Sequence, residues 1–527
     1  MFGTARNALH LSRLRIYSAL LPIAAAQRPR NVSTVSFDPT IRQFLVKLAE
    51  HQPCFSMHSS SVSIMHEPRL FYQTLLTVIR NARHRLFLSS LYIGHEDVEL
   101  VEAIRDSLRK HSTLHVYLHL DLNRSTRPGP GSTARILLPL LQEHPDRVHV
   151  SLFRSPKLKG IMARLVPPRF NEGWGTWHPK IYGADDTILI SGANLNTSYF
   201  TDRQDRYLQF TAQPRLADYC FDFLQAASTF SYSLLPSSGS SEDYVIHWSD
   251  AATHPHHIEA KAHHVLSSFQ KSQRESSTAS LAIPAEKASS EVPDGEDDVL
   301  VFPVIQAGLF DIREEERCLS LLFRQLSAQQ RYAMSSASNY DGPLVDLTSG
   351  YFALYKPYQA AMIESGLACR ILAASPKANG FYGSKGISGR IPEAYTLFER
   401  RFMHAVRTAR REWAPGSSDV IPGVQLHEWE REGWTYHAKG IWVRPTPSSD
   451  PVLTLFGSTN LNSRSANLDT ELSFVLATTS PSLQKKLASE VDGLRAHAHP
   501  WRGESDSKSR RVRLGTRALV GLVGGML

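Results

Sequence analysis

Two short motifs in this chain of 527 residues place a lysine two positions after a histidine, His178-x-Lys180 and His437-x-Lys439. An imidazole has an unperturbed pKa near ~6.5, so it can act as a base, an acid or a nucleophile near neutral pH. A neighbouring lysine can stabilise the charge that develops on a phosphoryl oxygen. We therefore expect the pair of motifs to cleave a phosphodiester without a metal. One histidine would attack phosphorus, and the other would move the protons of the leaving and accepting oxygens.

Each motif is followed by a glycine-containing turn and then by an acidic residue. The turns are SGANLN, which contains Asn194, and GSTNLN, which contains Asn460. Asp205 and Glu471 follow these asparagines by the same 11 positions. We expect the amides to donate to the phosphoryl oxygens, and the carboxylates to accept from the far nitrogen of each imidazole and so fix its tautomer.

These matches belong to an internal repeat. His178 follows Tyr92, and His437 follows Tyr351, by the same 86 positions. Each half contains, in the same order, a β-like run that includes the tyrosine, a second strand (LHVYLHLDL or ACRILAAS) and a hairpin that carries the histidine. The sequence thus predicts an α/β fold in which two such lobes form an intramolecular pseudo-dimer, with the active site at their interface.

The first motif continues as H-x-K-x4-D to Asp185 and so resembles the signature of the phospholipase D superfamily. The resemblance places Asp185 among the candidate catalytic residues. Its repeat position in the second half is Arg444, so the second motif lacks the aspartate, and this favours a structural role for Asp185. The fold that the resemblance implies is the same two-lobed phospholipase D-like arrangement.

Longer stretches in both lobes are similar to the eukaryotic phospholipase D-type phosphatidylglycerophosphate synthase family. They are SGANLNTSYFTDRQDRYLQF, ASPKANGFYGSKGISGRIPEAY and GWTYHAKGIW, and the likeness runs from Leu70 to Leu476. The resemblance implies transfer of a phosphatidyl group from CDP-diacylglycerol to sn-glycerol 3-phosphate through a phosphohistidine, with release of CMP and without a cofactor. This reaction leads towards phosphatidylglycerol and cardiolipin. Motif spacing by itself indicates only metal-independent phosphodiester chemistry.

Basic, glycine-rich loops after the central strand of each lobe suit the anionic groups that do not react. Backbone N–H groups of glycines can face an anion, and the cations neutralise it. The candidate substrate-binding residues in these loops are Arg124, Arg127, Lys377, Lys385 and Arg390.

The rest of the chain divides by composition. Residues 1–37 hold five arginines, no lysine and no acid, with leucines at helical spacing, which is typical of a mitochondrial transit peptide. We expect the lobes at 38–235 and 299–500, separated by a low-complexity insertion at 236–298. Residues 501–527 are basic and then apolar; the apolar part is too short to span a bilayer but could lie on an anionic surface. These features predict a mitochondrial protein bound peripherally to the inner membrane.

Composition excludes several other classes of protein. A chain with 42% hydrophobic and 20% charged residues is globular, and no apolar run reaches the ~18 residues of a spanning helix. The four cysteines lie far apart without a C-x-x-C pair, so a disulfide framework and a cysteine zinc site lack support. The histidines between 254 and 264 lie in polar surroundings, and we expect no metal. The sequence contains no apparent stripe of aromatic and basic residues that could stack on bases, so we expect no nucleic-acid partner.

Two alternatives share much of this pattern. A hydrolase of the same fold, either a mitochondrial phospholipase D or a nuclease, would pass the phosphoryl intermediate to water. A non-enzymatic scaffold would bind a membrane or nucleic acid without catalysis. The presence of both His-x-Lys motifs argues against the scaffold.

Overall fold

The structure is a computed structural model that describes residues 30–33, 36–129, 131–239, 242–276, 279–282, 297–333, 340–413, 420–503 and 510–526. Most of the expected leader, residues 1–37, therefore lies outside the described residues. Its described part includes strand β1 (Arg30–Ser33), which pairs in parallel with β13 (Ala279–Ala282). In the described part of the chain, none of the helices combines the length and the apolar character needed to cross a bilayer.

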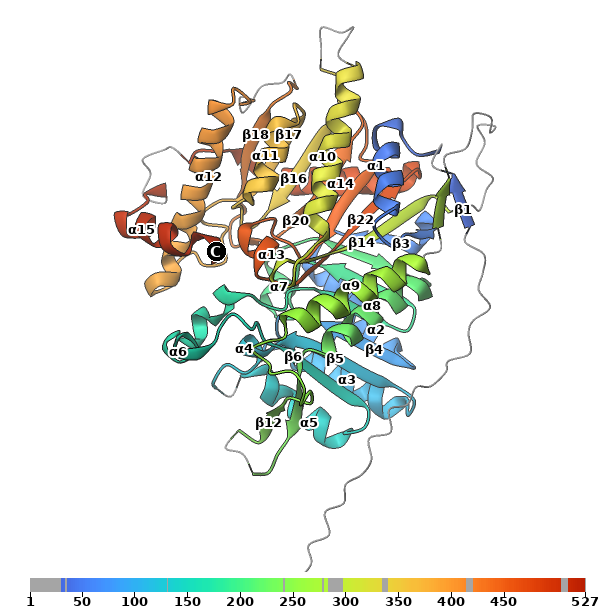
Figure 1. The fold of residues 1–527 in the computed structure, drawn as a ribbon, viewed down its shortest axis with the longest axis vertical. Helices are drawn as coiled ribbons and strands as arrows, with labels where there is room; N and C mark the ends of the chain where they lie inside the picture. The colour runs from blue at the N-terminus through green and yellow to red at the C-terminus, as the bar shows by residue number, and fades with distance from the viewer. Residues whose placement is uncertain are drawn as a thin grey trace, which may run out of the picture.

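The first lobe is built on a nine-stranded sheet, which occupies the lower half of Figure 1. Its three central strands β6, β5 and β4 are parallel, and antiparallel strands flank them on both sides. In order across the sheet the strands are β12 (Tyr244–His247), β11 (Tyr232–Pro236), β6 (Val148–Phe153), β5 (His115–Asp121), β4 (Arg85–Ser89), β7 (Ile181–Ala184), β8 (Thr187–Ser191), β10 (Tyr207–Phe210) and β3 (Val62–Met65).

The second lobe repeats this plan in a ten-stranded sheet. Its central strands β16, β17 and β18 are again parallel, and β20 again pairs in antiparallel fashion with the first of them. Across the sheet the strands are β15 (Ile312–Arg313), β14 (Val299–Ala307), β22 (Glu471–Thr478), β21 (Leu453–Gly457), β20 (Lys439–Arg444), β16 (Leu344–Ser349), β17 (Ala368–Ala374), β18 (Val424–Trp429) and β23 (Ala498–Pro500), with β2 (Phe55–Met57) on β14. The predicted α/β fold of two lobes with one plan is confirmed.

Amphipathic helices pack on these sheets. In α3, for example, Leu100, Ile104 and Leu108 recur every four residues and are buried, as expected of a helix with one apolar face. The helices of the first lobe are α2 (Pro68–Asn81), α3 (Val98–Lys110), α4 (Leu122–Ser125), α5 (Thr133–Glu143), α6 (Gly160–Leu165), α7 (Ser198–Thr201) and α8 (Pro214–Ser228). Those of the second are α10 (Glu314–Ala333), α11 (Lys356–Glu364), α12 (Ile391–Thr408), α13 (Ser463–Asn467), α14 (Pro481–Arg495) and α15 (Leu514–Val523).

The start of the expected first lobe differs from the sequence boundaries. Helix α1 (Pro39–Ala49) packs against α10, and β2 pairs with β14 of the second sheet. Phe44, Leu45 and Leu48 lie in the hydrophobic core of the second lobe. The segment that precedes the first lobe in sequence therefore belongs spatially to the second.

The expected insertion 236–298 also contains more structure than its composition indicated. Besides β12 it includes helix α9 (Glu259–Glu275), which packs against α8. Ala262 and Leu266 of α9 are completely buried in a core cluster. The sequence indicates a short helix near Ile258 to Phe269 in this segment, and α9 is the longer form of that helix; its buried stripe is narrow, so the many polar residues around it conceal its full length.

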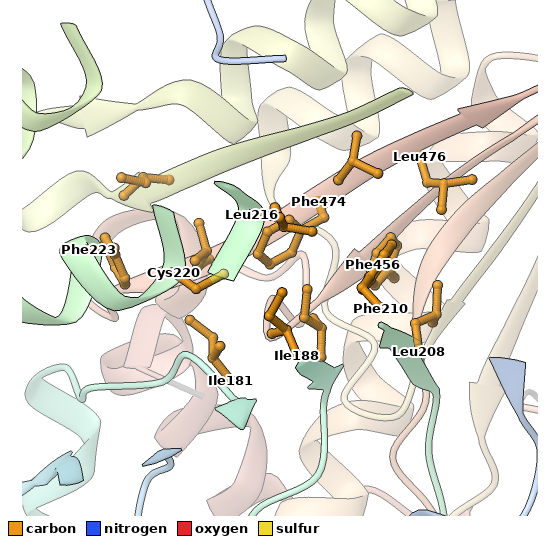
Figure 2. Close-up of a cluster of buried hydrophobic side chains, with 14 of the residues drawn as sticks. Ile181, Ile188, Leu208, Phe210, Leu216, Cys220, Phe223, Phe456, Phe474 and Leu476 are labelled. Carbon is orange, nitrogen blue, oxygen red and sulfur yellow. The ribbon is translucent and has the colours of Figure 1, made fainter. Parts of the chain in front are cut away.

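The two lobes share one hydrophobic core. Figure 2 shows Phe210 of β10 beside Phe456 of β21, with Phe474 and Leu476 of β22 nearby. The rings of Phe210 and Phe456 stack with centroids 6.2 Å apart and an interplanar angle of 19°. Because apolar residues from both sheets interdigitate here, the position of one lobe is fixed against the other.

A buried ion pair adds to this interface. Arg206 of the first lobe donates to both carboxylate oxygens of Glu490 in α14, each at 2.8 Å. Its guanidinium also lies 3.8 Å from the ring centroid of Trp442. The interface therefore has a directional, bidentate contact in addition to its apolar packing.

Candidate active site

The two motif histidines lie where the hairpins of the two lobes meet. His178 precedes β7, and His437 lies between β19 (Thr435–Tyr436) and β20. The backbone N–H of His178 donates to the carbonyl of Thr470 at 3.0 Å, and that of His437 donates to the carbonyl of Gln204 at 2.8 Å. Both histidines are only 3–4% exposed. Each histidine is therefore held by backbone of the other lobe.

Each histidine also pairs with the acid of the other lobe. Nδ1 of His178 lies 2.8 Å from Oε2 of Glu471, and Nδ1 of His437 lies 2.7 Å from Oδ2 of Asp205. A carboxylate that accepts from Nδ1–H fixes the tautomer and leaves Nε2 for chemistry. The arrangement is that of two histidine–carboxylate dyads, each assembled from both lobes.

The electrostatics of the first dyad favour a neutral imidazole beside an ionised carboxylate. Burial lowers the pKa of His178 below its ordinary value. Burial alone would raise the pKa of Glu471, but the contacts with His178 and Ser458 and the charge of Lys180 outweigh it and lower that pKa to about 2. A neutral His178 with its proton on Nδ1 has a free lone pair on Nε2, as a nucleophile requires.

The second dyad has a lysine in direct contact with its histidine. Burial, followed by the charge of Lys439, lowers the pKa of His437 well below its ordinary value, and burial raises the pKa of Asp205. Nζ of Lys439 lies 2.6 Å from Nδ1 of His437 and 3.6 Å from Oδ2 of Asp205. Burial lowers the pKa of Lys439 to about 8.

Lys180 is oriented differently from its repeat partner. Its Nζ donates to the carbonyl of His178 at 2.6 Å, and burial lowers its pKa well below the ordinary value. Lys439 and Glu471 are among the charges that act on it, so the structure brings both lysines into one group with both dyads. A bound phosphoryl group would favour the charged form of each lysine.

The structure adds two tyrosines that the sequence analysis did not select as site residues. The rings of Tyr199 and Tyr351 stand edge-on to the imidazole of His437, with centroids 5.1 and 5.4 Å away. Oη of Tyr199 lies 3.4 Å from Nε2 of His437. For Tyr351 the sequence offered one signal, its alignment with Tyr92 in the repeat. That alignment indicated a strand and not a residue of the site.

The two asparagines occupy equivalent turns but have different contacts. Nδ2 of Asn194 donates to Oη of Tyr199 at 3.1 Å, and its Oδ1 accepts from the N–H of Leu91 at 3.3 Å. Oδ1 of Asn460 is buried and has no hydrogen-bond partner among the described residues. With the amide turned over, the nitrogen of Asn460 could donate to a phosphoryl oxygen at the same position.

Gly192 shows why the first turn requires glycine. A Cβ at this position would lie 2.5 Å from Oδ1 of Asp205 and 2.6 Å from Nζ of Lys439. The turn of the first lobe thus approaches the second dyad more closely than any side chain would allow.

Asp185 does not lie with the other motif residues. Its carboxylate accepts from the backbone N–H groups of Arg83, His84 and Arg85, at 2.9, 3.0 and 3.0 Å. These amides lie at the start of β4, whereas Ser89 at its other end donates to the carbonyl of Pro179 beside the histidine. The structure therefore corrects the catalytic assignment of Asp185: it fixes the end of the β7–β8 hairpin.

Three of the candidate substrate-binding cations already have acidic partners. Arg124 pairs with Glu172 at 3.4 Å and lies 4.1 Å from the ring centroid of Tyr92. Arg127 bonds to the same Glu172. Lys377 pairs with Glu430 at 3.0 Å, a contact that raises the pKa of Lys377.

The other two cations lie around the second loop. Lys385 is exposed, and Arg390 is half-buried next to Gly515 of the C-terminal tail, where an added Cβ would lie 2.8 Å from its Nη1. Gly380 of this loop approaches an arginine that the sequence analysis missed: a Cβ there would lie 3.1 Å from Nη2 of Arg203. The guanidinium of Arg203 lies 4.4 Å from the ring centroid of Tyr199.

One group in the site has ligand atoms close enough to hold a cation. Nδ1 of His178 and carboxylate oxygens of Asp469 and Glu471 lie within 4.8 Å of one another. Asp469 already accepts from Thr176 and Arg464, at 2.8 Å in each case. All three residues thus have protein partners that a cation would have to displace.

Comparison with known proteins identifies the family. No family model matches the chain. A CDP-diacylglycerol–glycerol-3-phosphate 3-phosphatidyltransferase of Schizosaccharomyces pombe is 32% identical over 504 residues, which are 89% of this chain and 95% of that protein. A protein of the same name from Homo sapiens, described as mitochondrial, is 32% identical over 494 residues, or 89% of this chain and 84% of that protein.

A solved structure shares the fold. The crystal structure of phosphatidylserine synthase from Haemophilus influenzae superimposes with a TM-score of 0.63 at 18% identity, over 93% of this chain and 98% of that chain. The architecture is thus that of a phospholipase D-like protein. By its identity with curated relatives along most of their length, the chain belongs to the CDP-diacylglycerol–glycerol-3-phosphate 3-phosphatidyltransferase family.

Proposed function

We propose that this enzyme transfers a phosphatidyl group from CDP-diacylglycerol to sn-glycerol 3-phosphate and releases CMP and phosphatidylglycerophosphate, in the synthesis of phosphatidylglycerol and cardiolipin. The observation that carries the proposal is the pair of buried dyads, His178 with Glu471 and His437 with Asp205. The names of its relatives support the two substrates.

In the first step Nε2 of His178 attacks the phosphatidyl phosphorus. A nitrogen–phosphorus bond forms and the bond between phosphorus and the CMP oxygen breaks. The anionic phosphates of the bound donor raise the pKa of His437 from its low value in the free site, and the protonated imidazole supplies a proton to that oxygen. Two observations on the Nε2 atoms support this division of roles. No hydrogen bond to Nε2 of His178 occurs among the described residues, whereas Nε2 of His437 already contacts the hydroxyl of Tyr199.

In the second step His437 takes the proton of the acceptor hydroxyl of glycerol 3-phosphate. The hydroxyl oxygen attacks phosphorus, and the bond to His178 breaks. Lys180, Lys439, Asn194 and Asn460 are the donors available to the phosphoryl oxygens in both transition states. Because charge builds up on these oxygens, such donors stabilise the transition state more than the ground state.

Product analysis tests the proposal against the hydrolase alternative. Purified enzyme is incubated with CDP-diacylglycerol, with and without glycerol 3-phosphate, beside a His178→Ala control. The transferase releases CMP together with phosphatidylglycerophosphate, and product forms only with the acceptor. Phosphatidic acid formed equally well in its absence would establish a hydrolase instead.

Lys385 and Arg390 are proposed to bind a phosphate that does not react. Such a contact stabilises ground and transition states equally, so Lys385→Ala and Arg390→Ala should chiefly raise KM for one substrate. Lys180→Ala should instead lower kcat. Arg124, Arg127 and Lys377 could take the same role only by exchanging their partners Glu172 and Glu430 for substrate.

We further propose a mitochondrial location on the surface of the inner membrane. Exposed apolar side chains project from α6 and α15, which Figure 1 shows on one side of the molecule. Ile161 and Leu165 of α6 are 74% and 69% exposed, and Leu514 and Leu522 of α15 are 81% and 85% exposed. A bilayer would cover this apolar surface, as it covers the apolar faces of interfacial helices.

The tail contributes fewer free cations than its sequence indicates. Arg510 is bound to Glu428 and Arg513 to Glu393, so these two charges hold the tail on the protein. Flotation with phosphatidylglycerol-containing vesicles checks the membrane proposal. Leu514→Asp with Leu522→Asp should weaken binding, whereas Val98→Asp, at an exposed apolar position on α3, should not.

A further inference from the structure

A cavity lies between the lobes, and neither His178 nor His437 lines it. This flank cavity has a volume of about 380 Å³, within the range of pockets that hold small ligands. Both lobes contribute to its wall, which includes His66, Arg69, Gln204, Arg431, Trp434 and His497. Asp205, the partner of His437, is also among its lining residues.

Two arginines of the lining are available to bind an anion. In the described part of the chain, neither Arg69 nor Arg431 forms an ion pair, and Arg431 lies 3.9 Å from the ring centroid of Trp434. Of the three acids in the wall, Glu490 is paired with Arg206 at 2.8 Å and Asp205 with Lys439 at 3.6 Å, which leaves Glu67 as the acid without an ion pair among the described residues. Burial and the charge of Arg431 both lower the pKa of His497.

A glycine of a helix lines the cavity. Gly493 lies in α14 and is exposed, and no atom lies within 4 Å of the place where its Cβ would be. A larger side chain at this position would therefore occupy the cavity without displacing the packed helix.

We propose that the flank cavity binds a small phosphate monoester, separately from the phosphoryl group that reacts. Two guanidinium groups can each bind phosphate oxygens in bidentate fashion, and the imidazoles can donate further hydrogen bonds. Gln204 connects this site to the dyad: its Nε2 donates to the carbonyls of His66 and Asp205 at 3.1 and 3.0 Å. The backbone carbonyl of Gln204 accepts from the backbone N–H of His437.

Fluorine NMR on the full chain with 5-fluorotryptophan tests the proposal, since Trp434 lies in the wall. Trp434→Phe assigns its resonance. Inorganic phosphate, sn-glycerol 3-phosphate and CMP are titrated separately, without lipid donor, so no turnover occurs. A saturable shift of that resonance with at least one of them is expected, and the tightest binder identifies the source of the phosphate.

Two variants and two matched controls locate the binding. Gly493→Leu, which fills the cavity, and Arg69→Gln with Arg431→Gln, which removes its charge, should weaken binding by about tenfold or more, or ~1.4 kcal/mol. Ser489→Leu, one turn earlier in α14, and Lys486→Gln, an exposed cation on the same helix, should bind as the wild type does.

A Trp434 resonance that none of the three compounds moves would overturn the proposal, as would equal weakening in the controls. If Gly493→Leu fails to fold, the arginine variant decides. Because no reaction takes place, this result is independent of whether the transferase proposal holds.

Discussion

His178 and Glu471 belong to different lobes, yet Nδ1 of the histidine lies 2.8 Å from Oε2 of the acid. The reciprocal pair, His437 and Asp205, crosses the interface in the opposite direction at 2.7 Å. Each repeat therefore encodes a histidine and an acid that do not pair with each other. Neither lobe by itself holds a complete dyad, so both dyads depend on the shared core that fixes one lobe against the other.

Glu471→Gln should lower kcat by about 10³- to 10⁴-fold with little change in stability, because the amide cannot hold the Nδ1–H tautomer of His178 as the carboxylate does. Steady-state kinetics and thermal unfolding of the variant check this. A kcat within tenfold of the wild type would show that the crossed pair does not position the histidine.

Asp185→Asn should behave in the opposite way. The carboxylate accepts from three backbone amides away from the histidines, so its loss should lower Tm while kcat of the folded enzyme stays within about twofold. Parallel measurements of Tm and kcat distinguish the two roles. A large loss of kcat at unchanged Tm would return Asp185 to the catalytic residues.

The pH profile of kcat/KM should have two limbs. His178 must be neutral to attack; its pKa is lowered, so activity should persist as the pH falls below ~6.5 and fail only at lower pH. Lys439 must be charged, and its pKa of about 8 predicts a loss of activity as the pH rises through that value. In Lys439→Arg the guanidinium stays charged, so the alkaline limb should move upward. An unmoved limb would assign it to another group.

Arg206→Ala should destabilise the lobe interface by ~3–5 kcal/mol, because it leaves the charge of Glu490 buried without a partner. Replacing both residues, as in Arg206→Met with Glu490→Leu, removes the unpaired charge and should recover most of that loss. Denaturant unfolding of the single and double variants measures the difference. Equal loss of stability in both would mean that packing rather than charge dominates here.

The sequence predicted the residue types of the site better than their pairing. Phosphodiester chemistry limits the choice to a few side chains, and the equal spacing in the two halves located His178, His437 and both acids. The same spacing fits pairs within a lobe or across lobes, so only the packed interface reveals that Glu471 serves His178.

Other features depend on contacts that no local pattern carries. Tyr199 and Arg203 lie in the site only because the fold brings His437 and Thr435 of the second lobe against them. Helix α1 joins the core of the second lobe across a long sequence separation, so its amphipathic pattern did not indicate its partner. For Asp185, the family signature indicated a place among the site residues, whereas its hydrogen bonds hold it at the start of β4, away from the histidines.

The most direct test of the two-histidine mechanism is to trap the intermediate with CDP-diacylglycerol labelled in the phosphatidyl phosphate, by acid quench in the absence of acceptor. His437→Ala should retain protein-bound label on His178, and adding glycerol 3-phosphate should release it far more slowly than from the wild type. His178→Ala should retain none. Label that persists on His178→Ala and disappears from His437→Ala would contradict the assignment, and a wild type that never carries label would contradict the covalent mechanism itself.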